Sequence, residues 1–185
     1  MSGLHGTEPP SAWIQRWSHL VPVGGAVLDA ACGHGRHMRW FAGRGHAVTG
    51  IDRSPEAIAA VANIGEAINA DMENGPWPLQ HDGAPRQFAA VVVTNYLWRA
   101  LLPTLVASVA PGGVLLYETF ASGNESVGKP SRPDFLLRPG ELLQVCAGLR
   151  VVAFEDGFLE QPDRFVQRIA AVRETGQPPQ KRYTL

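Results

Sequence analysis

The sequence predicts an α/β fold, in which helices cover both faces of a mostly parallel sheet. Short apolar runs alternate along the chain with segments whose apolar residues recur at helical spacing. The run at residues 26–31 leads through Gly33-His34-Gly35 into such a helical segment, and a second apolar run follows at 47–51. This order of strand, glycine turn, helix and strand is the βαβ unit from which parallel sheets are built.

Composition is consistent with one domain. The 185 residues are 45% hydrophobic, which is enough for one well-formed core and too few residues for two ordinary domains. We therefore expect a single domain over residues 1–185, with a loose N-terminus at 1–10 and a C-terminal tail at 175–185. The formal net charge of −1 disfavours a nucleic-acid partner. The sequence contains no apolar run that could span a membrane, so we expect a cytoplasmic location and no membrane partner.

The other elements follow from local signals. Ser11 and Ser54 are suitable helix N-caps, and Pro55 suits the first turn of a helix. Glycine and proline are too frequent between residues 73 and 87 for a helix to form there. The predicted helices are 11–20, 55–65, 98–109 and 138–146, and the further strands are 67–70, 88–93, 114–117, 149–155 and 165–173.

The segment 121–139 is rich in glycine, proline and asparagine. A loop of this length that lacks helix signals is often an active-site lid. The alternative is an ordinary surface loop, and the sequence leaves both interpretations open.

The first βαβ unit suggests a nucleoside ligand. Gly33 and Gly35 allow a ligand to approach the backbone, and Asp52, at the end of the second strand, can accept hydrogen bonds from ribose hydroxyls. A dinucleotide site would have a third glycine where Met38 stands, and Asp29 would repel its pyrophosphate. Asp29 would instead attract an ammonium group. A nucleoside that carries an amino acid is S-adenosylmethionine, so we expect this cofactor rather than NAD.

Several segments resemble the motifs of class I S-adenosylmethionine-dependent methyltransferases, in particular the small bacterial, tellurite-resistance-like members. Ala31 departs from the pattern, because the family usually has a glycine there. The resemblance covers residues 13–173 and implies a Rossmann-like, seven-stranded, mostly parallel sheet with an antiparallel last strand and helices on both faces. The similar segments are 27–35, 48–54, 69–72, 91–96 and 110–113.

The resemblance also implies a set of cofactor-binding residues. The leading helix would cover the cofactor, and Asp71 with Met72 would border the adenine. The alternative for the two tryptophans of that helix is simple packing. The implied cofactor-binding residues are Trp13, Arg16, Asp29, Ala31, Gly33, Gly35, Arg36, Asp52, Arg53, Asp71, Met72 and Asn95.

Methyl transfer from a sulfonium is an in-line displacement that depends mainly on proximity and orientation. A general base is needed only if the acceptor must lose a proton, and the candidates are Glu118, Tyr96 and His37. Glu118 follows a strand at the sheet edge where ligands bind. Tyr96 and His37 could equally be packing residues.

The predicted function is methyl transfer to a small-molecule acceptor. The alternatives are a methyltransferase of RNA or protein that works with a partner, and a non-catalytic module that binds S-adenosylmethionine for regulation. We predict no metal site, because His34 and His37 could share a helical face but have no carboxylate ligand beside them.

Overall fold

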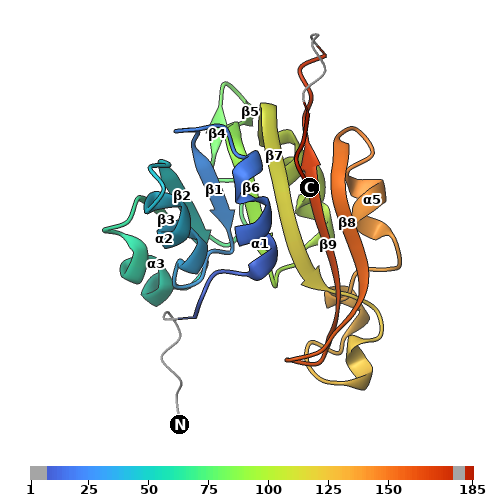
Figure 1. The fold of residues 1–185 in the computed structure, drawn as a ribbon. Coiled ribbons are helices and arrows are strands. Elements are labelled where there is room, and N and C mark those ends of the chain that lie inside the picture. The colour runs from blue at the N-terminus through green and yellow to red at the C-terminus, as the bar shows by residue number, and fades with distance from the viewer. Residues whose placement is uncertain (1–7, 177–181) are drawn as a thin grey trace.

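A seven-stranded sheet runs through the computed structural model, which describes residues 8–176 and 182–185 (Figure 1). The strand order is β3-β2-β1-β6-β7-β9-β8. β9 pairs antiparallel with both β7 and β8, and the other pairs of the sheet are parallel. The predicted mostly parallel sheet with an antiparallel last strand is confirmed. The strands are β1 (Val27–Ala30), β2 (Val48–Asp52), β3 (Glu66–Asn69), β6 (Phe88–Thr94), β7 (Val109–Phe120), β8 (Arg150–Leu159) and β9 (Arg164–Val172).

The central strand β6 shows why the chain forms this sheet. Its sequence is almost continuously apolar, as expected for a parallel strand that is covered on both faces. Val91 and Val93 belong to one hydrophobic cluster, and Ala90 and Val92 belong to the other. The alternation of side chains along this strand therefore supplies both cores.

Helices pack on both faces of the sheet (Figure 1). The N-terminal helices contribute to the cluster that contains Ala90 and Val92, and the helices after β6 contribute to the cluster that contains Val91 and Val93. The helices are α1 (Ala12–Trp17), α2 (Arg36–Ala42), α3 (Pro55–Val61), α4 (Leu102–Ala107) and α5 (Glu141–Val145), and the 3₁₀ turns are η1 (Ser18–Leu20), η2 (Arg99–Leu101), η3 (Asn124–Ser126) and η4 (Pro133–Phe135).

The predicted caps form, but several helices are shorter than predicted. Ser11 accepts a hydrogen bond from the Trp13 amide, and Ser54 accepts one from the Ala57 amide. The predicted helix 98–109 is reduced to the 3₁₀ turn η2 followed by α4. Pro103 lies in the first turn of α4, where a proline is tolerated because its missing amide proton would have no partner in the helix.

Strand β7 is longer than the predicted strand 114–117. The expected turn at 110–113 is present as an irregularity within β7: Phe88 and Ala90 on β6 pair with Val109 and Val114, so the intervening residues bulge out. Between β3 and β6 the chain forms the hairpin of β4 (Gln80–His81) and β5 (Ala84–Pro85). The prediction that no helix forms over 73–87 is therefore confirmed.

The segment 121–139 is anchored to the body of the protein. Ala121 and Leu137 form a β-bridge near its two ends. The buried Asn124 side chain donates to the Pro130 carbonyl and accepts from the Phe165 amide. Figure 1 shows this segment at the edge of the sheet where β7 ends. The segment is therefore folded and packs beside that edge.

The predicted loose N-terminus and C-terminal tail lie partly outside the described residues. Of the tail, the Thr184 carbonyl lies 3.0 Å from His19 Nε2, and Tyr183 packs against the cluster that includes α1. The described end of the tail is thus in contact with the domain. Among the described residues, no helix combines the length and the apolar character needed to cross a membrane.

Candidate functional site

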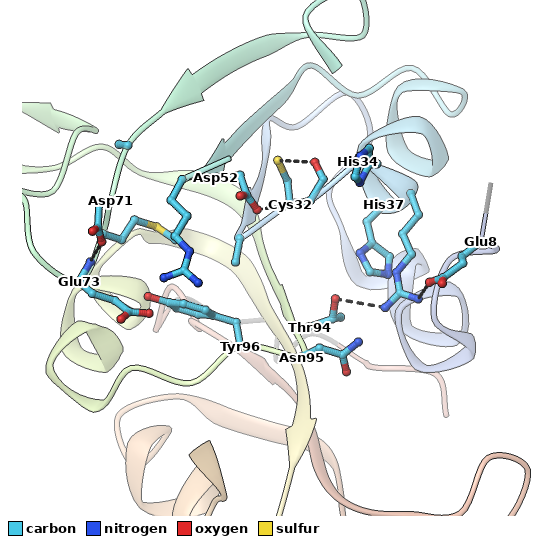
Figure 2. A pocket seen from close by; sticks show the side chains of 17 residues that line it. Glu8, Cys32, His34, His37, Asp52, Asp71, Glu73, Thr94, Asn95 and Tyr96 are labelled. Carbon is cyan, nitrogen blue, oxygen red and sulfur yellow. Dashed lines mark hydrogen bonds and ion pairs between the residues drawn. The ribbon is translucent and has the colours of Figure 1, made fainter. Parts of the chain in front are cut away.

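A pocket of about 390 Å³ opens where β1 and β6 end. β1 lies between β2 and β6, so the chain connections diverge at this point of the sheet. Open α/β sheets bind ligands at such a switch point, outside the carboxyl ends of the strands. Figure 2 shows the side chains around it. The described lining residues are Glu8, Ala31, Cys32, Gly33, His34, Gly35, Arg36, His37, Asp52, Arg53, Ala70, Asp71, Met72, Glu73, Thr94, Asn95 and Tyr96.

The loop between β1 and α2 depends on positive φ angles. Gly33 has φ 52° and Gly35 has φ 77°, and a Cβ on Gly35 would overlap the side chain of Val61. Ala31 has φ 56° in spite of its Cβ, which is a strained conformation for an L-residue. The loop therefore keeps its shape with alanine in the place where the resembling family has glycine.

Asp52, at the end of β2, is held by two backbone amides. Its Oδ2 accepts from the Gly33 amide at 2.8 Å, and its Oδ1 accepts from the Ser54 amide at 2.9 Å. A carboxylate offers about four acceptor positions, so lone pairs remain for a ligand. Figure 2 shows Asp52 between the two ends of the pocket. The glycine loop and the carboxylate thus form one preorganised unit.

Asp29 on β1 lies behind the pocket lining and is 2% exposed. Among the described residues, its Oδ2 has no hydrogen-bond donor. Burial raises the pKa of this carboxyl from 3.8 to about 7, with a contribution from Asp52, while Arg36 opposes the change. The sequence predicted that Asp29 holds the ammonium of the cofactor directly or through water; in the structure it is a buried carboxyl group behind the pocket lining.

His37 lines the pocket, but both of its ring nitrogens face protein groups. Its Nε2 accepts a hydrogen bond from the Ser11 amide at 3.2 Å, and its Nδ1 lies 3.9 Å from Asp29 Oδ2. Because an amide can only donate, the proton of the neutral ring is on Nδ1. Burial, and secondarily Arg36, lowers the pKa of His37 to about 3. The structure corrects its assignment as a general base, since both ring nitrogens are directed at protein groups.

Glu118 is also misassigned as a base. It is 1% exposed on β7, and its carboxylate accepts from the Ser11 hydroxyl at 3.0 Å. Arg168 lies 3.4 Å and Arg164 lies 3.7 Å from its oxygens. Ser11 therefore joins Glu118 and His37, and these two residues hold the start of α1 against the sheet.

The end of the pocket away from His37 contains Asp71, Met72, Glu73 and Tyr96. Asp71 Oδ1 accepts from the amides of Glu73 and Asn74, which fixes the carboxylate at the rim. In Figure 2 the Tyr96 hydroxyl points toward Glu73, away from Thr94 and Asn95. Burial raises the pKa of Tyr96. The structure thus places Tyr96 in the pocket and directs its hydroxyl away from the end where it was expected to act as a base.

Trp13 and Arg16 do not line the pocket. Trp13 is 2% exposed, donates from Nε1 to the Ile169 carbonyl, and packs against Trp17. Arg16 is exposed and stacks on Trp17. The structure corrects their predicted cofactor contacts and supports the packing alternative for the tryptophans, because α1 presents its apolar side to the sheet.

The structure adds six lining residues that the sequence interpretation did not include. Thr94 is the last residue of β6, and Glu73 lies in the loop after β3, so the rule for ligand sites in α/β sheets could have found them. Cys32 and His34 lie within the glycine loop. No local signal identifies Glu8, which reaches the pocket from the N-terminal segment. The six are Glu8, Cys32, His34, Ala70, Glu73 and Thr94.

Comparison with known proteins finds similarity to methyltransferases. Residues 27–113 match a family described as "Methyltransferase domain". The chain is 33% identical over 130 residues to the ribosomal protein L11 methyltransferase of Xanthomonas axonopodis pv. citri, covering 65% of this chain and 42% of that protein. It is 30% identical over 124 residues to the ubiquinone biosynthesis O-methyltransferase of Pseudomonas fluorescens, covering 63% and 53%. The chain thus spans about half the length of these relatives, or less.

Among solved structures, TehB from Haemophilus influenzae is similar with a TM-score of 0.67 at 17% identity, covering 91% of this chain and 63% of that chain. The fold is Rossmann-like, and the matched segment is similar to a methyltransferase domain. The resemblance predicted from the sequence is confirmed, and the fold is similar to that of TehB and of a TehB-like S-adenosylmethionine-dependent methyltransferase.

Proposed function

We propose that the chain binds S-adenosylmethionine in this pocket and transfers its methyl group to a small-molecule acceptor. The observation that carries the proposal is the Asp52 carboxylate, fixed by the Gly33 and Ser54 amides beside a glycine loop at the sheet switch point. This arrangement suits the two ribose hydroxyls of a nucleoside. The domain would comprise residues 1–185.

The charges around the pocket favour this cofactor. Among the described lining residues, the carboxylates of Asp52, Asp71 and Glu73 outnumber the two guanidinium groups of Arg36 and Arg53, and Glu8 is paired with Arg36. The buried Asp29 adds negative potential. S-adenosylmethionine carries a net positive charge, whereas the pyrophosphate of a dinucleotide would be repelled. The excess of carboxylates also disfavours the phosphates of RNA.

Each end of the pocket suits one part of the cofactor. At one end, Asp71 would accept from the adenine amine, and Met72 and Tyr96 would border the ring. At the other end, Arg36 would hold the methionine carboxylate, while Asp29 attracts the ammonium through its field. Asn95, on a positive φ of 54°, would lie beside the methyl group with Thr94.

When bound, the cofactor would supply a methyl group on its sulfonium sulfur; an acceptor lone pair could displace it in line, with the S–CH₃ electron pair returning to sulfur. The residues of the pocket align the two reactants and exclude water. Glu118 and His37 are committed to Ser11, so we propose no proton transfer through them.

The proposal is tested by calorimetric titration of S-adenosylmethionine, S-adenosylhomocysteine and NAD. The matched variants are Asp52→Asn, which removes the charge at constant size, and Asp82→Asn in the β4–β5 turn. Loss of a hydrogen-bonded charge costs about 1.5–3 kcal/mol, so Asp52→Asn should weaken binding of the first two ligands about tenfold or more. The Asp82 variant should bind as the unmodified protein does. Binding of NAD alone, or of no ligand, contradicts the proposal.

The acceptor is tested separately, by release of S-adenosylhomocysteine in the presence of small-molecule candidates. A protein acceptor is the second candidate, because one relative is named as a methyltransferase of ribosomal protein L11. Turnover with ribosomal protein L11 and with no small molecule would favour it. Cofactor binding without turnover on any acceptor would favour a regulatory module.

A further inference from the structure

Glu8 and Arg36 form an ion pair inside the pocket. Glu8 Oε2 lies 3.6 Å from Arg36 Nη1, and Arg36 Nη2 donates to Thr94 Oγ1 at 3.4 Å. Both distances exceed the roughly 2.7–2.9 Å of a strong charge-assisted hydrogen bond. Arg36 is therefore held loosely by its two neighbours and can take a better acceptor.

Glu8 is brought to the pocket by an anchored stretch of backbone. Three residues later, Ser11 is bonded to both His37 and Glu118. The Gln15 side chain donates to the Pro10 carbonyl at 2.8 Å, which ties the intervening backbone to α1. Figure 2 shows Glu8 at the end of the pocket that contains His37, Thr94 and Asn95. The Glu8 carboxylate is thus directed to this end by the fold.

The same guanidinium is the one that suits the cofactor carboxylate. Arg53, the other arginine among the described lining residues, lies at the proposed adenine end, where its charge helps to lower the pKa of Asp71 and opposes the rise in the pKa of Tyr96. If the proposed function holds, the methionine carboxylate and the Glu8 carboxylate must share or compete for Arg36, and they repel each other at close range. We propose that Glu8 is a specificity-determining residue that competes with the carboxylate of the cofactor for Arg36.

The consequence is selective. Glu8 lowers the affinity for nucleosides that carry a carboxylate, and it leaves the affinity for a nucleoside without one unchanged. Glu8 is 65% exposed in its side chain, so solvent weakens the effect. An ion pair of this exposure corresponds to about a two- to fivefold change in affinity.

The experiment compares two thioether nucleosides of zero net charge by calorimetry at low salt, where charge effects are least screened. S-adenosylhomocysteine carries the carboxylate, and 5′-methylthioadenosine lacks the whole amino-acid end. The variants are Glu8→Gln and, as a control, Glu160→Gln, an exposed glutamate of the β8–β9 turn. Glu8→Gln should bind S-adenosylhomocysteine about two- to fivefold more tightly and methylthioadenosine unchanged. Glu160→Gln should bind both as the unmodified protein does.

A double-mutant cycle identifies Arg36 as the shared partner. In an Arg36→Ala background the gain from Glu8→Gln should disappear, although binding itself is weaker. Unchanged or weaker binding of S-adenosylhomocysteine by Glu8→Gln overturns the inference, and so does an equal gain for both ligands; the proposed function survives either result. If the unmodified protein binds neither nucleoside, the proposed function fails and this inference falls with it.

Discussion

Replacing Asp29 with asparagine should stabilise the protein and impair cofactor binding. Burial raises the pKa of Asp29 from 3.8 to about 7 in the folded state. Because the folded pKa is the higher one, the stability that Asp29 contributes is complete below the unfolded pKa and is lost as the pH rises through about 7. The difference of about three pH units, at 1.36 kcal/mol each, corresponds to about 4 kcal/mol lost above pH 7.

The assay is the free energy of unfolding in urea at about pH 5 and about pH 8.5. The stability contributed by Asp29 falls between its unfolded pKa of 3.8 and its folded pKa of about 7, and about two pH units of this range lie above pH 5. The free energy of unfolding of Asp29→Asn should therefore exceed that of the unmodified protein by about 2–3 kcal/mol more at pH 8.5 than at pH 5. Asp163→Asn, in the exposed β8–β9 turn, should show no such pH dependence. An advantage for Asp29→Asn that is equal at both pH values, or larger at pH 5, would refute the reasoning.

Calorimetry on the same Asp29→Asn protein tests its functional cost. Binding of S-adenosylmethionine should weaken, because the negative field beneath the ammonium is removed. Binding of 5′-methylthioadenosine, which has no ammonium, should change less. Equal losses for both ligands would indicate a distorted loop rather than a lost charge.

Three further predictions concern stability. Ala31→Gly should raise the melting temperature by a few degrees, because it relieves about 1–2 kcal/mol of backbone strain at φ 56°. This relief exceeds the cost of the greater conformational entropy that glycine gives the unfolded chain. The control Ala30→Gly, within β1, should lower the melting temperature. Arg99→Ala should lower the free energy of unfolding by about 1–3 kcal/mol and speed hydrogen exchange in the 121–139 segment. The reason is that Arg99 pairs with Glu141 and donates to two carbonyls of that segment. The control Arg132→Ala, at an exposed ion pair, should lower it by less than about 1 kcal/mol. Burial lowers the pKa of His37, so the stability that His37 contributes is present above its unfolded pKa of 6.5 and is lost as the pH falls. Between about pH 6.5 and 4 this loss amounts to about 3 kcal/mol in the unmodified protein, and His37→Gln should not show it. Urea titrations in which the variant keeps the full loss would contradict this.

The sequence by itself determined the sheet and the centre of the pocket. The apolar run before Gly33, the Ser54 cap and the acid after the second strand are all local signals, and periodicity and turn chemistry act within a few residues. Once the strands are parallel, their carboxyl ends lie at the same edge. Asp52, Asp71 and Asn95 therefore come together without further information, as the predicted order of elements implied.

The tertiary structure alone decided which polar residues face the pocket. Glu118 looked like a base because it follows the core of a strand, yet Ser11, 107 residues away in sequence, covers its carboxylate. His37 is engaged by the same residue across 26 positions. Glu8, three residues before the anchored Ser11, pairs with Arg36. Burial and hydrogen-bond partners of a side chain depend on such long-range contacts, which no local pattern in the sequence encodes.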